Sequence, residues 1–400
     1  MKVTGIDWVP SIPDNWSVVR LKDIAKLQSG NGITSADIDE VGDYPVYGGN
    51  GLRGYTSSYT NEGKYVLIGR QGALCGNINY AKGKFYASEH AVVVYPRNRN
   101  ENTTWLGETL RMANLNRLST SAAQPGLSVS VLNCQFIPYP PDEERIKIGK
   151  YLDKKLADID NRVVVLEKER DAYARLKKSI INQAVTRGLD PEVKLKDSGI
   201  DWIGMIPEHW EVTRLKSLFT ECKQVSNTGE EDLLSVSEYY GVARRLDKME
   251  DGEYESRADS LIGYRICKKG DLVINIMLAW KRGLGFSDYD GIVSPSYAVY
   301  RGKDIIPHYY HYLMRTDMYV AVFKRNSKGI IDSRLRLYND RFNNILTIVP
   351  PLSEQEAIAN YLDEKCAKID AAIENIDKQI DASNRLKKAI INEAISGNAI

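Results

Sequence analysis

The chain carries one long segment twice, and this repeat limits its possible folds more than any other feature. The first copy begins at Pro140 and reads PPDEERIKIGKYLDKKLADIDNRVVVLEKERDAYARLKKSIINQA; the second begins at Pro350 and reads PPLSEQEAIANYLDEKCAKIDAAIENIDKQIDASNRLKKAIINEA. The copies align without a gap at a constant offset of 210 residues. Each opens with Pro-Pro, which suits the first turn of a helix, and after that opening only Gly149 could interrupt one. Each copy therefore predicts one long helix.

Apolar residues recur within each copy at alternating spacings of four and three. This is the a/d seam of a coiled coil, and charged residues flank it. An isolated amphipathic helix cannot bury its seam alone, so we expect the two copies to pair with each other. The seam residues are Leu152, Leu156, Ile159, Val163, Leu166 and Tyr173 in the first copy, and Leu362, Cys366, Ile369, Ile373, Ile376 and Ile380 in the second.

The direction of this pairing follows from chain reach. A helix of roughly 45 residues spans about 65 Å. The dozen or so residues between Arg187 and Gly199 reach at most about 40 Å. The second globular segment must then begin near the far end of the first helix, so we predict an antiparallel pair with a globular domain at each end.

A shorter repeat precedes each globular segment. It reads GIDWVPSIPDNWSVVRLKDI from Gly5 and GIDWIGMIPEHWEVTRLKSL from Gly199, at an offset of 194 residues. We call these two segments the openers. Their paired tryptophans are predicted to pack where a domain meets a helix. The apolar helix tails around Ile180 and Ile390 are expected to pack on the openers or on partner subunits.

The segments between the shared elements, about 24–139 and 218–349, do not resemble each other. Both contain short β-rich runs and glycine turns, and a helix is expected over 308–323. The predicted fold class is α+β, with two globular domains separated by a pair of long antiparallel coiled-coil helices in an internal repeat. The expected boundaries are 1–139 for the first domain with its opener, 140–187 for the first helix, 188–198 for a linker, 199–349 for the second domain and 350–396 for the second helix.

Composition indicates a soluble, globular, cytoplasmic protein. The net charge is +1, with 27% charged and 43% hydrophobic residues. No apolar run approaches the roughly 18 residues of a membrane span, and no signal-peptide core begins the chain. The five scattered cysteines suggest neither disulfides nor a zinc site. No phosphate-binding loop, methyltransferase loop or dinucleotide fingerprint is present, so we expect no catalysis, cofactor or metal.

The combination of opener, helix start and helix tail, repeated around two divergent segments, resembles the specificity subunits of type I restriction-modification systems. The motifs that carry the resemblance are GIDWVPSIPDNW, PPLSEQEAIANYLD and RLKKAIINEA. The first helix start departs from the second by Arg145 in place of Gln355, and its seam survives. The resemblance implies that each divergent segment reads one half of an interrupted site in double-stranded DNA. It also implies that the helices space the domains and hold two methyltransferase subunits, with restriction subunits joining the full complex.

Base and phosphate contacts require amide and cationic side chains on turns. In the first segment the glycine-rich turn carrying Asn50 and Arg53 fits this need, although a glycine hairpin without a ligand fits the pattern equally well. Arg70 and Gln71 follow a predicted strand and suit guanine and adenine. The small, polar run with Ser121 and Gln124 could follow a DNA backbone or be a plain solvated loop.

In the second segment basic and aromatic residues cluster near turns. The run around 324–336 is the densest positive patch of the chain, and we favour phosphate contacts there over a merely solvated face. His308 and His311 could ligate a metal, but no further ligand accompanies them and surface histidines are the better reading. The candidate residues here are Tyr239, Arg244, Arg245, Lys281, Arg282, Arg325, Asn326, Lys328, Arg334 and Arg336.

Two other readings stay open. The chain could be a stand-alone DNA-modifying enzyme, either a nuclease or a methyltransferase fusion. It could instead be a scaffold or antagonist that binds methyltransferase subunits without reading DNA.

Overall fold

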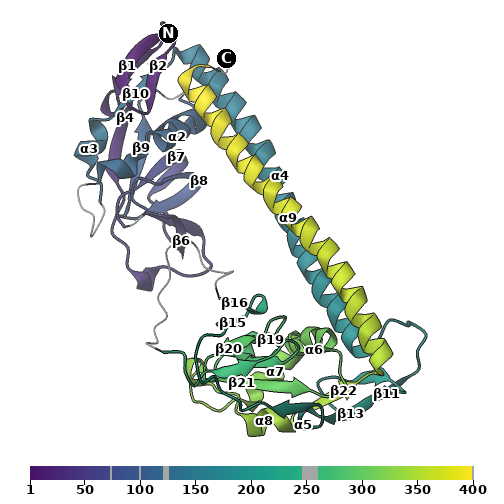
Figure 1. Cartoon of the computed structure of the whole chain (residues 1–400). Helices are drawn as coiled ribbons and strands as arrows, with labels where there is room; N and C mark the ends of the chain where they lie inside the picture. Colours follow the sequence, from purple (N-terminus) through teal and green to yellow (C-terminus); the bar gives the residue numbers. More distant parts are fainter. Residues whose placement is uncertain (73, 99–100, 120–125, 246–259, 399–400) are drawn as a thin grey trace. The chain divides into compact units, whose positions relative to one another are not determined.

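A computed structural model describes residues 1–72, 74–98, 101–119, 126–245 and 260–398 of the chain. The chain forms two compact units, Met1–Lys168 with Asp377–Ile400, and Glu169–Ile376. Both long helices contribute to both units (Figure 1). These units divide each long helix, whereas the domain boundaries expected from the sequence lie at the ends of the helices. The expected boundaries remain a proposal.

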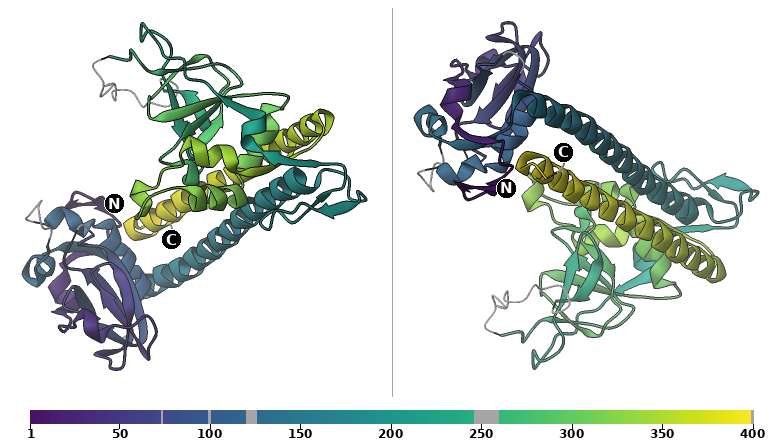
Figure 2. Two further views of the ribbon diagram at one scale, coloured as in Figure 1. Left: turned by 90° about the horizontal axis from the view of Figure 1, so that it is seen from below. Right: turned by 90° about the horizontal axis from the view of Figure 1, so that it is seen from above.

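The two long helices are α4 (Asp142–Arg187) and α9 (Leu352–Ser396), and they run in opposite directions within each unit (Figure 2). In the first unit Lys387 Nζ lies 2.6 Å from Asp160 Oδ1. In the second unit Lys177 Nζ lies 2.6 Å from Asp370 Oδ1. These are the same ion pair made twice, because the residues correspond at the offset of 210. The predicted antiparallel pair is confirmed.

Most of the predicted seam is buried. The half-buried exceptions are Val163, Tyr173, Ile373 and Ile380. A pair of helices shields a seam from two sides only, which accounts for this partial exposure. The buried seam residues are Leu152, Leu156, Ile159, Leu166, Leu362, Cys366, Ile369 and Ile376.

The first unit contains a six-stranded sheet in the order β4-β9-β7-β8-β5-β6 (Figure 1). Its neighbours pair antiparallel except β5 with β8. The strands are β4 (Ala25–Ser29), β5 (Tyr44–Gly48), β6 (Gly51–Thr56), β7 (Asn61–Gly69), β8 (Ile78–Ala87) and β9 (Ala91–Pro96).

Both faces of this sheet are covered by apolar side chains. Along β7, Val66 and Ile68 enter the main core while Leu67 joins a second cluster with Phe85 on the other face. Such alternation is the period of two expected for a strand. The smaller elements of the unit are β1 (Lys2–Ile6), β2 (Val9–Ile12), β3 (Ser17–Arg20), α1 (Leu21–Ile24), η1 (Ser35–Asp37), α2 (Thr103–Met112), η2 (Leu115–Leu118), α3 (Val129–Asn133) and β10 (Phe136–Tyr139).

The second unit is built around a four-stranded sheet in the order β14-β21-β18-β19. Its strands are β14 (Phe219–Glu221), β18 (Leu272–Asn275), β19 (Leu284–Phe286) and β21 (Tyr297–Gly302). Two strand pairs accompany it, β15 (Leu234–Ser237) with β16 (Gly241–Arg244) and β17 (Arg265–Cys267) with β20 (Gly291–Val293). The remaining elements are β11 (Leu195–Asp197), β12 (Met205–Pro207), β13 (Glu211–Arg214), α5 (Leu215–Leu218), η4 (Ala279–Lys281), α6 (Pro307–Met314), α7 (Asp317–Asn326), η5 (Asp332–Arg334), α8 (Asn339–Asn344) and β22 (Leu346–Val349).

The single helix expected over 308–323 is in fact two helices. The helix α6 ends at Met314, and Thr316 caps the start of α7 by accepting a hydrogen bond from the Tyr319 amide. A threonine in extended conformation whose hydroxyl accepts a hydrogen bond from the amide three residues later is a common N-cap of a helix. The sequence did not indicate this break because the helical spacing of apolar residues continues across it.

Each opener is fixed to the start of a long helix by one glutamate. The indole Nε1 of Trp16 donates to Glu144 Oε2 at 2.7 Å in the first unit. Trp210 Nε1 donates to Glu354 Oε2 at 2.9 Å in the second. Both tryptophans are buried, as expected for packing at a junction.

The tail of the other long helix closes each junction. The end of α9 joins the core cluster of Trp16, and the end of α4 joins that of Trp210, which confirms the predicted packing of the tails on the openers. Gly397 and Gly188 terminate the helices with φ near +77° and +76°. A Cβ on Gly397 would lie 2.5 Å from Pro13, whereas one on Gly188 would lie 3.5 Å from Trp210.

A third repeated contact connects each long helix to a helix of its own domain. Asp153 on α4 accepts hydrogen bonds from Asn102 Nδ2 and Thr104 Oγ1 at the start of α2. Its counterpart Asp363 on α9 accepts from Tyr312 Oη at 2.7 Å on α6. One helix of each domain, α2 or α6, is thus held at an equivalent point of its long helix.

Among the described residues, none of the helices combines the length and apolar character needed to cross a bilayer. The five cysteines are free thiols. Cys75, Cys267 and Cys366 are buried, Cys222 is half-buried and Cys134 is exposed.

Candidate nucleic-acid interface

In the first unit the candidate residues meet where β7 ends. The β5–β6 turn approaches so closely that a Cβ on Gly49 would lie 3.0 Å from the Gln71 carbonyl oxygen. Asn50 Oδ1 accepts a hydrogen bond from Asn77 Nδ2 at 3.3 Å. The structure therefore brings Asn50 beside the Arg70–Gln71 pair, although the three residues come from different turns.

The backbone of Arg70 is held on both sides. Its amide donates to the His90 carbonyl at 2.8 Å, and its own carbonyl accepts from the Leu127 amide at 2.9 Å. The guanidinium Nη1 lies 3.4 Å from Ser29 Oγ, and the Gln71 side chain is exposed. The pair borders a cavity of about 290 Å³ that is also lined by Leu118, Gly126, Leu127, Ser128 and Val131.

The other two candidate positions of the first segment are less informative. Arg53 lies in β6, is exposed, and covers Gly48, where a Cβ would be 2.5 Å from Arg53 Cδ. Ser121 and Gln124 lie outside the described residues.

In the second unit two lysines from separate segments meet over one tryptophan, and further basic candidates follow one of these segments in the sequence. The Nζ atoms of Lys281 and Lys324 lie 5.0 and 4.9 Å from the ring centre of Trp280. The backbones of Lys328 and Arg336 pair through two hydrogen bonds of 2.9 Å, which brings their chain segments together. We call this cluster the Trp280 patch; it comprises Trp280, Lys281, Lys324, Arg325, Asn326, Lys328, Arg334 and Arg336.

The side chains of the Trp280 patch differ in how freely they could meet a ligand. Lys281, Arg325, Lys328 and Arg334 are exposed. The half-buried Asn326 donates instead to the Val322 carbonyl at 2.9 Å, and the half-buried Arg336 donates to its neighbours' carbonyls. Lys324 is exposed as well but pairs with Asp332 at 3.0 Å, so the other four cations are the ones that suit a phosphate backbone.

Sequence reasoning missed two parts of this surface. Trp280 itself carried no motif, because its role depends on cations from two separate segments. The adjacent Ile330 is fully exposed and Ile331 is 53% exposed. Two isoleucines set among lysines and arginines were a signal in the sequence that could have been used.

The remaining candidates of the second segment lie elsewhere. Arg244 pairs with Asp232 at 3.2 Å and stacks on Tyr289. Burial raises the pKa of Tyr297, and the charge of the neighbouring Arg245 opposes that rise. Arg282 is bonded to Asp317 and donates to the Arg315 carbonyl. Arg244 and Arg282 are therefore largely occupied within the protein.

Tyr239 and Arg282 border a cavity of about 690 Å³ that also involves α4, α6 and α9. Arg315 fixes its wall by donating to four carbonyls, those of Arg282, Leu284, Glu238 and Tyr239, at 2.7 to 3.0 Å. Burial and the nearby Arg282 charge lower the pKa of Arg315 to about 10. Burial lowers the pKa of His311, another lining residue, to about 4. His308 instead contacts Asp363 at 3.3 Å.

Comparison with known proteins finds similarity to one family. The family model "Type I restriction modification DNA specificity domain" matches residues 13–164. The specificity subunit of the Escherichia coli type I restriction enzyme EcoprrI is 39% identical over 40% of this chain and 41% of its own length. The MjaVIII specificity subunit of Methanocaldococcus jannaschii is 23% identical over 96% of this chain and 93% of its own.

Residues 13–164 thus match a type I specificity domain, and the chain as a whole is similar to type I specificity subunits. Its match to EcoprrI, and to a second relative from Mycoplasma pneumoniae at 30% identity, spans only about half or less of those specificity subunits. Longer matches are more distant, as for the EcoBI specificity subunit of E. coli, with 23% identity over 98% of this chain and 88% of its own.

The fold of this chain also has a solved counterpart. A chain from the structure described as "Structural basis underlying complex assembly and conformational transition of the type I R-M system" superposes with a TM-score of 0.66. The alignment covers 97% of this chain and 99% of the other at 14% sequence identity. At that identity the likeness concerns the fold alone.

Proposed function

We propose that the chain is the non-catalytic DNA-specificity subunit of a type I restriction-modification complex and reads a bipartite target. The observation that carries the proposal is the repeated frame: three equivalent contacts per unit hold two unlike domains on two equivalent helices. Because the helices and openers repeat and only the inserted domains differ, the two domains suit two different half-sites. The similarity to type I specificity subunits supports the same conclusion.

In the first domain, 1–139 in the proposed boundaries, the Arg70–Gln71 pair would read base edges. Arginine pairs with guanine and glutamine with adenine through two hydrogen bonds each. Asn50 and Arg53 would contact the adjacent backbone. The fixed backbone of Arg70 supports this role because a reading side chain needs a rigid base.

In the second domain, 199–349, the Trp280 patch would bind phosphates. Its exposed lysines and arginines supply the charge, and the chain's net charge of only +1 makes their concentration on one patch meaningful. Ile330 and Ile331 would give the patch an apolar tip. Arg244 and Arg282 are weaker candidates because they already have carboxylate partners, whereas Tyr239 and Arg245 stay candidates at their sequence positions.

Rigid linkage of two weak readers makes the second contact intramolecular, which raises affinity and fixes the gap between half-sites. The long helices would supply this linkage and hold two methyltransferase subunits, with restriction subunits completing the complex. The half-exposed seam positions leave apolar surface for such partners. We place the complex in the cytoplasm, where its DNA target is.

Selection from random duplexes tests the proposal. The full chain with its modification subunit should enrich a motif of two parts separated by a fixed number of unspecified bases. Variants of Arg70 and Gln71 should change one part only. Enrichment of a single uninterrupted motif would contradict the bipartite reading.

The same material separates the competing functions. A scaffold or antagonist would bind the modification subunit and enrich no sequence. A stand-alone enzyme would cleave or methylate DNA when the purified chain is incubated with DNA, magnesium and S-adenosylmethionine. We expect the chain alone to be inert in that assay.

A further inference from the structure

The starts of the two long helices differ at one buried position that performs the same task in both units. Arg145 Nη1 donates to the Pro140 carbonyl at 2.7 Å. Gln355 Nε2 donates to the equivalent Pro350 carbonyl at 2.8 Å. One arm of each side chain thus closes the Pro-Pro turn, and the other arm is free to contact the recognition domain.

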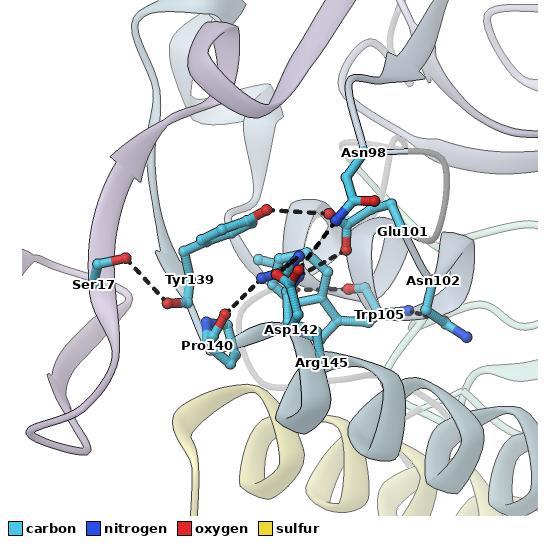
Figure 3. A network of polar contacts seen from close by, with 10 residues as sticks. Ser17, Asn98, Glu101, Asn102, Trp105, Tyr139, Pro140, Asp142 and Arg145 are labelled. Atoms are coloured by element: carbon cyan, nitrogen blue, oxygen red, sulfur yellow. Dashed lines mark hydrogen bonds and ion pairs between the residues drawn. The ribbon is translucent and has the colours of Figure 1, made fainter.

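In the first unit that second arm meets a carboxylate (Figure 3). Arg145 Nε donates to Glu101 Oε1 at 2.9 Å, and the side chains are only 3% and 1% exposed. Tyr139 Oη donates to the other oxygen of Glu101, and its ring lies 3.9 Å from the guanidinium. Asp142 accepts from Arg145 Nη2 at 2.6 Å. Burial raises the pKa of Glu101, which the Arg145 charge opposes.

In the second unit the second arm meets a backbone amide. Gln355 Oε1 accepts from the Ile306 N–H at 2.9 Å, directly before α6, and Gln355 is fully buried. No charge is involved. The positions of Tyr139 and Asp142 are taken by Val349 and Leu352, which can neither stack on nor pair with a guanidinium in that way.

Neither residue can serve at the other junction. Glutamine at 145 would leave Glu101 buried without a cationic partner, and breaking a buried pair on one side is strongly destabilising. Arginine at 355 would direct N–H groups at the Ile306 N–H and bury an unpaired charge. The contacts through Glu144 or Glu354 and through Asp153 or Asp363 use the same residue type in both junctions and cannot distinguish the domains. Gly149 adds a steric requirement of the first domain, because a Cβ there would lie 2.0 Å from Asn102 Cγ and the equivalent residue of α9 is Ala359.

We propose that the residue at 145 or 355 is the positioning residue that matches each recognition domain to its own helix, so the domains can exchange places only if this residue moves with them. The proposal rests on the proposed function in assigning DNA reading to those domains. The match itself is a property of the junction. It would set which half-site is read from which end of the chain.

A pair of substitutions tests the first junction in the full chain. Arg145→Gln should lower the midpoint of thermal unfolding of the first unit by about 10 °C, from the cost of an unpaired buried carboxylate. Glu101→Gln together with Arg145→Gln should recover most of that loss. Glu144→Gln, which removes a contact common to both junctions, should give the same loss with and without the Glu101 change. Equal losses for the single and double Arg145 variants would overturn the match.

A chimera tests the exchange itself. Residues 218–349 are replaced by a second copy of 24–139, so that Glu101 and Tyr139 face α9, and every version also carries Ala359→Gly to leave room for the copied Asn102. With Gln355 retained, this chain should unfold about 10 °C below the version carrying Leu352→Asp and Gln355→Arg. Equal midpoints would overturn the proposal.

DNA selection gives a readout that stability alone would not move. Below its unfolding transition, the repaired chimera should enrich two copies of the first half-site at one fixed gap, while the chimera with Gln355 should enrich them over a spread of gaps. An identical gap distribution would overturn the positioning role. If the unaltered chain itself enriches no sequence, the proposed function fails, and the unfolding comparisons still decide the match.

Discussion

At the scale of single residues, the function depends on side chains whose backbones are fixed and whose tips remain available. Arg70 meets this description: two backbone hydrogen bonds fix it at the end of β7, and its tip borders an open cavity. Arg282 has an equally cationic tip, but Asp317 occupies it. Charge by itself therefore did not identify the better candidate.

Replacement of Arg70 by alanine should lower affinity for the cognate duplex about 10- to 100-fold and relax the preference at one base of the first half-site, because a bidentate base contact is lost. Competition binding with duplexes altered at single positions measures this. Lys82→Ala removes the same charge from the far end of the β7–β8 pair and should leave the preference unchanged. An equal loss for every duplex would make Arg70 a phosphate contact.

His311 should make the second unit sensitive to mild acid. Its pKa is about 4 in the fold and 6.5 in an unfolded chain, so the unfolded state takes up the proton first. The stabilisation is complete above pH 6.5 and is lost as the pH falls toward 4. Arg315 and His308 reinforce the lowering, and Asp363 opposes it.

The measurement is the unfolding midpoint between pH 7 and pH 4. His311→Gln should flatten that part of the curve, whereas His308→Gln, on the exposed face of α6, should keep it. A His311 variant with an unaltered slope would show that other groups cause the acid sensitivity.

At the scale of elements, the junctions are built from pieces that are far apart in sequence. Each opener tryptophan is held by the start of one long helix and the end of the other. The repeat made the helices, their antiparallel pairing and the packing of the openers predictable. It did not make the Asp153 and Asp363 contacts predictable, because their partners lie in the divergent segments.

The role of Arg145 was hidden for the same physical reason. The substitution relative to Gln355 is visible in the sequence, but Glu101 belongs to a segment with no counterpart to compare. The break between α6 and α7 was hidden because apolar spacing continues through Thr316. The sequence repeat thus predicted the two long helices and the packing of the openers. The contacts of the divergent domains with the helices became visible only in the structure.

The two terminal glycines give a matched test of the helix ends. Gly188→Ala should cost about 1 to 2 kcal/mol, the strain of a left-handed backbone. Gly397→Ala should cost about 2 to 4 kcal/mol, since the new methyl group also meets Pro13. Denaturant unfolding followed separately for each unit measures both. Equal costs would mean that Pro13 moves aside freely.

At the scale of the whole molecule, the long helices should act as the measure of the gap. Duplicating residues 162–168 after Lys168 and 372–378 after Lys378 adds one heptad to each helix, about 10 Å. The preferred gap between half-sites should then grow by about three base pairs. Selection from duplexes with gaps of varied length reports the result.

Lengthening only one helix is the control for the heptad insertion. It takes the two seams out of step and should weaken folding or binding without defining a new gap. If the doubly lengthened chain keeps the original gap, the helices do not set the spacing.

Because the end of α9 packs against the first junction, the folding of the N-terminal domain depends on residues near the C-terminal end of α9. A truncation after Ile390 would remove Ile391, Ala394 and Ile395 from the core that surrounds Trp16. A premature stop at that point should therefore impair reading of the first half-site, whose domain lies far upstream in the sequence, and should leave the second domain able to bind its half-site.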